Sequence, residues 1–266
     1  TRVALVVSQF PSQEHPYIWD WVKGLVSTGL DVRVITENIL ARSGTYSDDA
    51  LLSRVLLMNS PSSPRASILS NWQRVMQSVA PPSRIVTAAN VITAHEHKRR
   101  TVVRKLYEYL PILNCSFDIV HFNAPQIAIR RFELGRIFNA KTVVSFRGQD
   151  FTFYPDRYDR LLHAADRLHF ISEHLLQEAR KRGYNGSKHS LIPPMVDTEF
   201  YHPQTAAESR HNEGPLRLFT AARFSWTKGW EFALQAVALL VERGIDVHYY
   251  IAGEGDFRDA VLYTIH

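Results

Sequence analysis

The chain has 266 residues, of which 45% are hydrophobic and 21% are charged. This length allows one large or two ordinary domains, and the composition is that of a soluble globular protein. The longest apolar runs are far shorter than the ~20 residues of a membrane-spanning helix, which argues against an integral membrane protein. A single cysteine, Cys115, excludes a disulfide within the chain and favours a reducing, cytoplasmic compartment. The net charge of +5 fits an anionic small molecule, an anionic membrane surface or nucleic acid equally well.

Short strands rich in β-branched residues alternate with amphipathic helices, and this predicts an α/β fold with a parallel sheet covered by helices. The first unit is a strand at residues 3–7, a helix with apolar positions from Ile18 to Val26, and a strand at 32–36, with Gly29 as a left-handed cap. The middle of the chain, up to about residue 113, is ambiguous. It contains one expected strand at 54–58 and expected loops at 43–49 and 60–64.

The alternation resumes after residue 117. Strands are expected at 118–122, 142–146, 167–171 and 190–192, with helices near 127–138 and 157–165. A further helix is expected between Ser172 as N-cap and Gly183 just past its end. Together these elements predict a complete, doubly wound, Rossmann-like domain.

A polar stretch at residues 202–215 interrupts the pattern, so we expect the domain boundary there, with domains at 1–210 and 211–266. A new βαβ unit follows, with a strand at 216–221, a helix from Trp230 to Val241 and a strand at 247–251. Of the two tryptophans near the start of that helix, Trp226 could pack on a nucleotide base or sugar. Trp230 falls on the apolar stripe and is expected in the core.

Ligands of open parallel sheets bind beyond the carboxyl ends of the strands, so the loops at 9–12, 121–123, 147–150 and 223–229 are candidate site segments. In the last loop Arg223 and Lys228 stand five residues apart, directly before Gly229 and the start of a helix. An arginine fork, a lysine charge and a helix N-terminus together suit a polyanion such as a diphosphate. The alternative is that both cations are ordinary solvated surface charges.

The segment from Leu216 to Phe257 resembles the opening of the C-terminal domain of glycosyltransferase family 4, which comprises retaining enzymes with the two-domain GT-B fold. The shared pattern is a strand, an arginine, a Lys-Gly pair five positions later, an amphipathic helix, a second strand and a Gly-x-Gly turn. Most of the N-terminal part is also similar to this family, while the middle is poorly covered. The matching stretches are Phe10-Pro11-Ser12, Phe117 to His121, Ser172-Glu173, and Ile192 to Asp197 with Phe200 and Pro203.

The resemblance implies a GT-B-like fold, in which the complete acceptor-side domain 1–210 precedes the first βαβ unit of a nucleotide-sugar-binding domain, 211–266. It implies a retaining hexosyltransferase that moves a sugar from a nucleotide-diphosphate sugar to a glycan or lipid-linked acceptor in polysaccharide or glycoconjugate biosynthesis. Neither a cofactor nor a catalytic metal is implied. The implied donor residues are Arg223, Lys228 and Gly229 with the turn Gly253, Glu254 and Gly255, and the implied acceptor or cleft residues are Pro11, Ser12, His121 and Asn123.

Two departures from the family pattern matter. Arg147 stands where related members often carry a histidine, and Arg147 and Asp150 are the candidate catalytic residues. An arginine cannot act as a base at neutral pH, but it could orient an acceptor or steady the departing phosphate. A structural ion pair between the two residues is the alternative, just as His121 could contact an acceptor or merely cap its strand.

The second departure is that no two glutamates of the sequence are separated by seven residues, although the family pattern has such a pair later in the C-terminal domain. A second domain of only about 50 residues lacks the core to stand alone, so we expect the 266-residue chain by itself to be inactive. The lack of that glutamate pair, together with Arg147, keeps a second hypothesis open, a non-catalytic sugar-phosphate-binding or partner-binding protein with the same fold.

Two further clusters have competing interpretations. His95 and His97 flank Glu96, but two histidines without a third ligand at a matching spacing are weak support for a metal site. The basic run from Lys98 to Lys105 is interleaved with apolar residues at helical spacing. Such a helix can lie on anionic lipid, here the inner face of a membrane, or pack on a core with a solvated charged back. No nucleic-acid-binding module is recognisable, and nucleic acid is not an expected partner.

Overall fold

The computed structural model describes residues 1–12, 15–39, 46, 48–59, 80–148, 150–153, 156–196, 198–199, 202 and 214–265. The chain divides into two compact units, Thr1–Met195 and Val196–His266, and each unit is described by itself. The boundary expected between residues 210 and 211 lies outside the described residues, as do Asp197, Phe200, Pro203 and the expected loop at 60–64.

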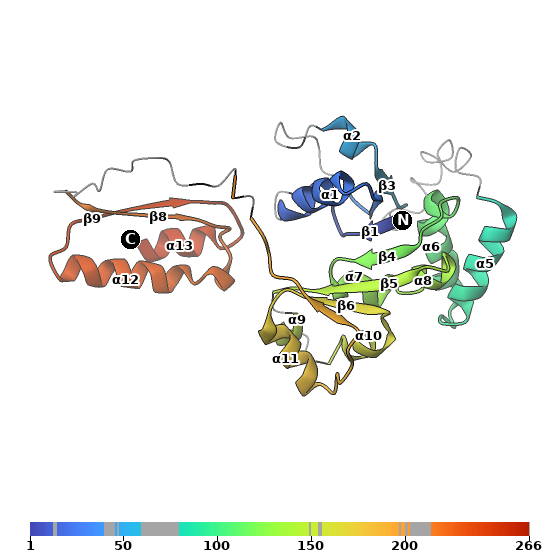
Figure 1. The fold of residues 1–266 in the computed structure, drawn as a ribbon. Coiled ribbons are helices and arrows are strands. Elements are labelled where there is room, and N and C mark those ends of the chain that lie inside the picture. Colours follow the sequence, from blue (N-terminus) through green and yellow to red (C-terminus); the bar gives the residue numbers. More distant parts are fainter. Residues whose placement is uncertain are drawn as a thin grey trace. The chain divides into compact units, whose positions relative to one another are not determined.

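Unit 1 contains a seven-stranded, fully parallel sheet in the order β3-β2-β1-β4-β5-β6-β7 (Figure 1). All seven predicted strands are confirmed to within one residue at each end. The strands are apolar because a parallel sheet is covered on both faces. Their bounds are β1 Arg2–Val6, β2 Asp31–Thr36, β3 Val55–Leu57, β4 Ile119–Phe122, β5 Lys141–Phe146, β6 Arg167–Phe170 and β7 His189–Leu191.

The two faces of the sheet bury separate cores. Alternate residues of β1, such as Leu5, pack with helix α1 (Tyr17–Ser27) in one core, and their neighbours, such as Val6, lie in the larger core on the other face. The larger core also takes in residues of most of the remaining helices. These are α5 Pro82–Thr93, α6 Arg99–Tyr109, the 3-10 turn η1 Leu110–Ile112, α7 Pro125–Arg131, α8 Leu134–Ile137, α9 Asp150–Phe153, α10 Asp159–Ala164 and α11 Glu173–Lys181.

Several helix signals of the sequence are confirmed. The Ser172 hydroxyl accepts a hydrogen bond from the backbone N–H of Leu175 at 3.3 Å and caps α11. Gly29 and Gly183 both adopt the left-handed conformation just after their helices. The short helix α2 (Asp49–Leu52) is an addition, and it begins at the end of a segment expected to be a loop.

The single helix expected near 127–138 is wrong. The chain forms two helices, α7 and α8, with a turn at Phe132 and Glu133 between them. This turn places the Glu133 carboxylate beside Lys105 and the Tyr109 hydroxyl. The helical pattern of the sequence is continuous across this turn, but a local pattern is only a weak constraint on helix length.

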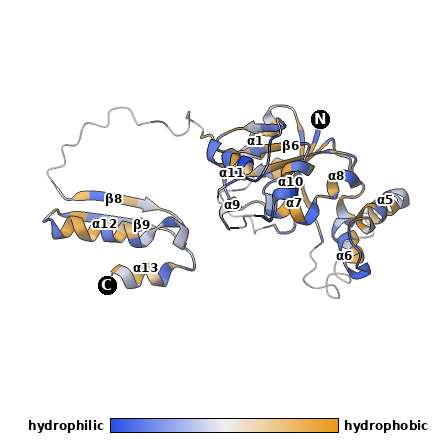
Figure 2. Ribbon diagram, turned by 90° about the horizontal axis from the view of Figure 1, so that it is seen from below, coloured by the Kyte–Doolittle hydropathy of each residue, from blue (hydrophilic) through white to orange (hydrophobic). Residues whose placement is uncertain are grey.

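Unit 2 is a parallel pair of strands, β8 (Leu216–Ala221) and β9 (Val247–Ala252), connected by η2 (Trp226–Lys228) and helix α12 (Trp230–Glu242) and followed by α13 (Arg258–Ile265). The predicted βαβ unit is confirmed. Helix α12 is mostly apolar, and its hydrophilic residues include Glu231, Gln235 and Glu242 (Figure 2). Trp230 is only 1% exposed and packs against Phe224 at 5.0 Å between ring centres, so its expected core position is confirmed.

Candidate functional site

The strand order of unit 1 reverses between β1 and β4, and ligands of doubly wound sheets bind beyond the strand ends at such a point. The loop after β1 places Pro11 and Ser12 there, and both are buried. Ser12 is 3% exposed, yet its hydroxyl has no hydrogen-bond partner in the described part of the chain. A buried hydroxyl without a partner costs about 1–3 kcal/mol, so it is a group that a ligand can satisfy.

Arg147 follows β5 and is held on three sides. Its Nε donates a hydrogen bond to Oδ1 of the buried Asn123 at 2.8 Å. Its guanidinium carbon lies 4.5 Å from the ring centre of Tyr17 and 5.4 Å from that of Trp21. These two rings stand one turn apart on α1 and therefore share a face of the helix. Hydrogen bonding and the two aromatic rings thus fix the guanidinium plane.

Asp150 shapes the backbone beside Arg147. Its Oδ2 accepts a hydrogen bond from the backbone N–H of Arg147 at 2.7 Å, and its Oδ1 accepts one from Nε2 of Gln126 at 2.7 Å. Burial raises the pKa of the Asp150 carboxyl, and the two hydrogen bonds oppose this rise. Both residues lie in the described chain, and the ion pair that was the alternative interpretation is not formed between their side chains. Gln149, between them in sequence, is outside the described residues.

A chain of polar side chains crosses three strands next to this site. The Nε2 of His121 lies 2.7 Å from the Ser145 hydroxyl, which lies 2.8 Å from Nδ1 of His169. The His169 Nε2 lies 3.0 Å from the backbone oxygen of Ile192, and the His121 ring meets the Trp21 ring edge-on at 4.9 Å. Burial lowers the pKa values of both histidines, that of His121 to about 3, so both rings are neutral near pH 7.

Because both rings are neutral, the hydrogen bonds that link His121, Ser145 and His169 can have only one donor-to-acceptor order. A backbone carbonyl only accepts, so His169 carries its proton on Nε2 and its Nδ1 accepts the Ser145 hydroxyl proton. The Ser145 oxygen then accepts from Nε2–H of His121. The Nδ1 atom of His121 is therefore left as an acceptor, which is the atom that a hydroxyl group of a ligand could use.

This arrangement predicts a pH-dependent stability. Because the pKa of His121 falls from 6.5 to about 3 on folding, its contribution is complete above pH 6.5 and is lost as the pH falls toward 3. Between pH 7 and pH 5 the loss should reach about 2 kcal/mol. His121→Gln can still donate a hydrogen bond to Ser145 but does not titrate. It should therefore lose less unfolding free energy between pH 7 and pH 5. Denaturant unfolding of both proteins at the two pH values measures the difference, and equal losses would show that His121 is not buried in this way.

The carboxyl edge of unit 2 brings two loops together. Arg223 follows β8, its backbone oxygen accepts a hydrogen bond from Nε1 of Trp230 at 3.0 Å, and its side chain is exposed. Lys228 is also exposed and ends η2, and Gly229 is the N-cap residue of α12 and provides no side-chain cap. The cations and an uncapped helix start thus lie in one short loop, as an anion site requires.

The Gly253-Glu254-Gly255 turn lies against that loop. The backbone N–H of Phe224 donates to the backbone oxygen of Glu254 at 2.8 Å. A Cβ added at Gly253 would lie 2.0 Å from the backbone oxygen of Ala222, and one at Gly255 would lie 2.4 Å from that of Phe224. Glycine is therefore required at both positions, because only backbone without side chains fits beside the chain that carries Arg223.

No protein-family model and no curated protein matches the sequence, but solved glycosyltransferase structures match in fold. The structure of a glycosyltransferase from Rickettsia africae ESF-5 has 16% identity and a TM-score of 0.59, with 100% of this chain and 65% of that chain covered. HepE from Anabaena, in complex with UDP and glucose, has 13% identity and a TM-score of 0.61 at 99% and 65% coverage. Sucrose-phosphate synthase from Thermosynechococcus elongatus has 14% identity and a TM-score of 0.56 at 100% and 73% coverage.

The fold is GT-B-like. The expected fold class is thereby confirmed. The chain spans about 65% of the length of the first two of these structures. At 13–16% identity the likeness concerns the fold, so membership of family 4 and retention of configuration stay predictions.

Within this GT-B-like frame the structure brings together Asn123, Arg147 and Asp150, and it joins His121 to them through Trp21. The sequence analysis missed Tyr17, Trp21, Ser145 and His169. Ser145 and His169 carried a signal, since polar residues inside strands that are buried on both faces are uncommon. Tyr17 and Trp21 could have been recognised in the sequence as two aromatic residues four positions apart on the helix that follows the first loop.

The His95-Glu96-His97 cluster has other contacts. Nε2 of His95 lies 2.7 Å from Nη1 of Arg136, and Glu96 pairs with Lys105 at 3.0 Å. Across the described ranges, no group of three or more His, Cys, Asp or Glu side chains could hold a metal ion. The described helices also include none with the length and apolar character needed to cross a membrane.

Proposed function

We propose that this protein is a retaining glycosyltransferase that transfers a sugar from a nucleotide-diphosphate sugar to a glycan or lipid-linked acceptor. The observation that carries the proposal is the loop after β8, which presents Arg223 and Lys228 at the uncapped start of α12, with the glycine turn of residues 253–255 packed against it. The GT-B-like fold supports it, and HepE of the same fold is solved with UDP and with UDP-glucose.

The proposed role of the two cations is stabilisation of the leaving group. Negative charge grows on the diphosphate as its bond to the sugar breaks, and cations placed beforehand stabilise that charge without reorganisation. An arginine fork can bind two phosphate oxygens, whereas a lysine supplies a compact charge. We assign Arg223, Lys228 and Gly229 to the diphosphate, and Gly253, Glu254 and Gly255 to the donor-side turn.

Residues 1–210 are proposed as the acceptor-side domain and 211–266 as part of the nucleotide-sugar-binding domain. At the carboxyl edge of unit 1, Ser12 offers a buried hydroxyl without a partner in the described chain. His121 offers the Nδ1 acceptor, so these two side chains are the proposed contacts to acceptor hydroxyl groups. Pro11 and Asn123 are also assigned to the acceptor side, and Asn123 accepts the hydrogen bond from Nε of Arg147.

The two candidate catalytic residues receive different roles in this proposal. Arg147 faces the substrate, and it acts by charge rather than as a base. Asp150 uses both carboxylate oxygens within the protein and is a positioning residue for the backbone of Arg147. Neither role needs a metal or a cofactor.

A transfer assay tests the proposal and separates it from the second hypothesis, a binding protein that has lost the chemistry. We expect the full-length protein to transfer the sugar of an α-linked nucleotide sugar, with UDP-glucose as the first donor, and to give an α-linked product by NMR. A β-linked product would overturn retention. Tight binding of UDP-glucose without transfer or hydrolysis of any nucleotide sugar would favour the binding protein.

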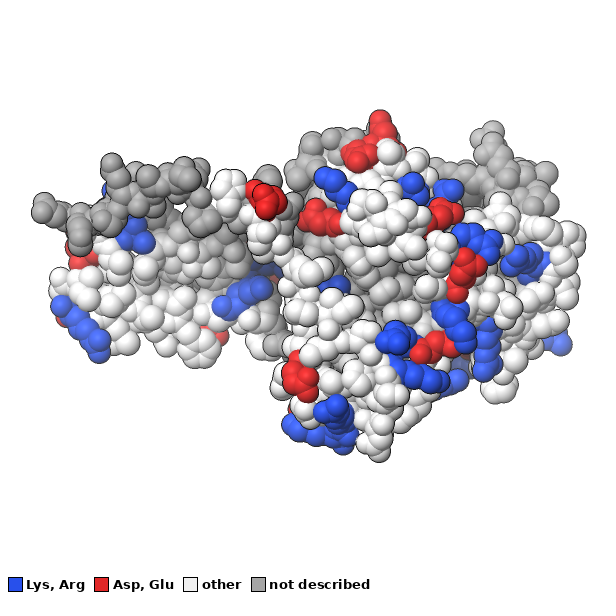
Figure 3. Space-filling view, viewed as in Figure 1, with Lys and Arg blue, Asp and Glu red and all other residues white. Residues whose placement is uncertain are grey.

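The basic helix α6 suggests a peripheral contact with anionic lipid at the inner face of the membrane. Its core side is occupied, since Leu106 packs on the core and Lys105 is 12% exposed in ion pairs with Glu96 and Glu133. Its outer side carries exposed Lys98, Arg99, Arg100 and Arg104 around Val103, which is 66% exposed. Figure 3 shows Lys and Arg side chains on the visible face of unit 1, interspersed with Asp and Glu side chains.

Replacing Lys98, Arg99 and Arg100 by glutamine should weaken binding to anionic vesicles about a hundredfold. A basic residue near an anionic surface contributes about 1 kcal/mol, so three contribute about 3 kcal/mol. Sedimentation with phosphatidylglycerol vesicles measures this, and a substitution of the exposed Lys181 of α11, Lys181→Gln, is the control. Equal sedimentation of the triple variant and the original protein would remove the membrane contact from the proposal.

A further inference from the structure

The guanidinium of Arg147 is partly buried and forms no ion pair in the described part of the chain. Asp150, close in sequence, gives its two carboxylate oxygens to the backbone N–H of Arg147 and to Gln126. Two other buried or partly buried basic residues of unit 1, Lys105 and Arg131, do have carboxylate partners. Lys105 pairs with Glu133 at 2.7 Å, and Arg131 pairs with Glu37 and with Glu108.

A buried charge without a counter-charge is costly, because the protein interior replaces its hydration poorly. Consistent with this cost, burial lowers the pKa of Arg147, although the group stays protonated near neutral pH. Tyr17 and Asp150 act in the opposite direction and raise the pKa of Arg147, but they do not offset the burial. An oxyanion from outside the chain would supply the missing partner.

The contacts of Arg147 leave two of its nitrogen atoms available to bind such an oxyanion. The Nε atom is used by Asn123, and the flat side of the guanidinium lies over Tyr17 and near Trp21. The two terminal nitrogens, Nη1 and Nη2, have no hydrogen-bond partner within the described residues. They form the pair of donors that matches two oxygens of a carboxylate or phosphate. Since both the rings and Asn123 fix the plane, little side-chain freedom is lost on binding.

We propose that Arg147 is an oxyanion-binding residue of unit 1, which takes a carboxylate or a phosphate of a substrate between Nη1 and Nη2. This inference rests on the proposed function for the identity of that substrate. It extends the function, because it predicts a second anion site besides the loop at Arg223 and Lys228. The anion belongs either to an acidic acceptor, such as a uronate or a sugar phosphate, or to the donor.

Calorimetry with four probes tests the proposal on the full-length protein: glucose, glucuronate, glucose 6-phosphate and UDP. We expect at least one of the two acidic sugars, or UDP, to bind about tenfold more weakly to Arg147→Gln than to the original protein. Arg147→Lys, which keeps the charge without the fork, should lose less. Arg84→Gln is the matched control, since Arg84 is also partly buried and bonds only the Ser116 hydroxyl among the contacts described.

The pattern of losses identifies the source of the anion. A loss confined to the acidic sugars places it on the acceptor, and a loss confined to UDP places it on the donor. If Arg147→Gln binds every probe as the original protein does, or if the original protein binds neither acidic sugars nor UDP, the oxyanion site is wrong. Acidic-sugar binding that depends on Arg147 in a protein without transferase activity would uphold this site and reject the proposed function.

Discussion

Lys228→Ala is expected to lower turnover with a nucleotide sugar by at least about tenfold in the full-length protein. One preorganised charge contact to a developing anion contributes about 3 kcal/mol, which corresponds to roughly a hundredfold in rate. In Lys228→Ala, Arg223 still stabilises the leaving group in part, so the expected loss of turnover is at least about tenfold. Steady-state kinetics with saturating donor measure it. The loss should appear in kcat, because the charge on the diphosphate is largest in the transition state.

The control for this prediction lies on the same helix. Arg243 is an exposed cation at the opposite end of α12, directly after its last residue Glu242. Arg243→Ala removes a charge of the same sign and should leave kcat within about twofold, since exposed charges far from the reacting group contribute little. Equal effects of the two variants, or unchanged kinetics of Lys228→Ala, would contradict the assignment of this loop to the diphosphate.

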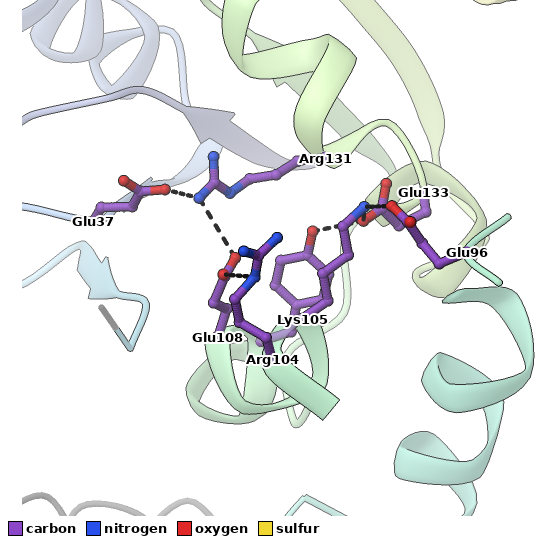
Figure 4. A network of polar contacts seen from close by, with 8 residues as sticks. Glu37, Glu96, Arg104, Lys105, Glu108, Arg131 and Glu133 are labelled. Atoms are coloured by element: carbon purple, nitrogen blue, oxygen red, sulfur yellow. Dashed lines mark hydrogen bonds and ion pairs between the residues drawn. The ribbon is translucent and has the colours of Figure 1, made fainter. Parts of the chain in front are cut away.

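Lys105→Ala is expected to cost unit 1 about 3 kcal/mol of unfolding free energy. Figure 4 shows the network that the substitution would break. The Lys105 Nζ lies 2.7 Å from Glu133 and 3.0 Å from Glu96, and the Glu133 side chain is only 8% exposed. Without the ammonium group, Glu133 keeps the hydrogen bond from the Tyr109 hydroxyl as its one remaining partner among the contacts of the described residues. A carboxylate that loses its partner in a buried site typically costs about 3–5 kcal/mol, and the partial exposure of Glu96 favours the lower end.

Lys181→Ala is the matched control for stability. Lys181 also lies close to a carboxylate, 2.6 Å from Glu178, but its side chain is 71% exposed. Pairs of this kind contribute about 0.5 kcal/mol or less. Urea unfolding followed by circular dichroism compares the two variants with the original protein. Losses of the same size in both variants would mean that the Lys105 network is no more than a surface ion pair.

Most of the fold could be predicted from the sequence because parallel strands are short apolar runs bounded by turn residues. The nine predicted strands all occur, and Ser172 and Gly29 act at the helix ends as expected. The helix expected near 127–138 failed for a tertiary reason. Its pattern is locally consistent, but Glu133 turns toward Lys105, which is far away in sequence and belongs to the ambiguous middle segment.

The candidate site was predictable only in part. Arg223 and Lys228 stand in a recognisable pattern within one loop, whereas the surroundings of Arg147 come from three separate segments. Its contacts to Asn123 and to the rings on α1 depend on the order in which the strands pair. Arg147 and Asp150 were predicted as candidate catalytic residues, with an ion pair between their side chains as the alternative. The structure instead shows a carboxylate bonded to backbone, a difference that residue spacing cannot reveal.

The central claim is that the loop from Arg223 to Gly229 recognises a diphosphate, and the affinities of UDP and UMP test it most directly. The two ligands differ in one phosphate group, and hydrogen bonds to charged groups contribute about 1.5–3 kcal/mol each. We predict that the full-length protein binds UDP at least about tenfold more tightly than UMP by calorimetry, and that Lys228→Ala removes most of this preference. Equal affinities for UDP and UMP, or a preference that Lys228→Ala leaves intact, would contradict the account.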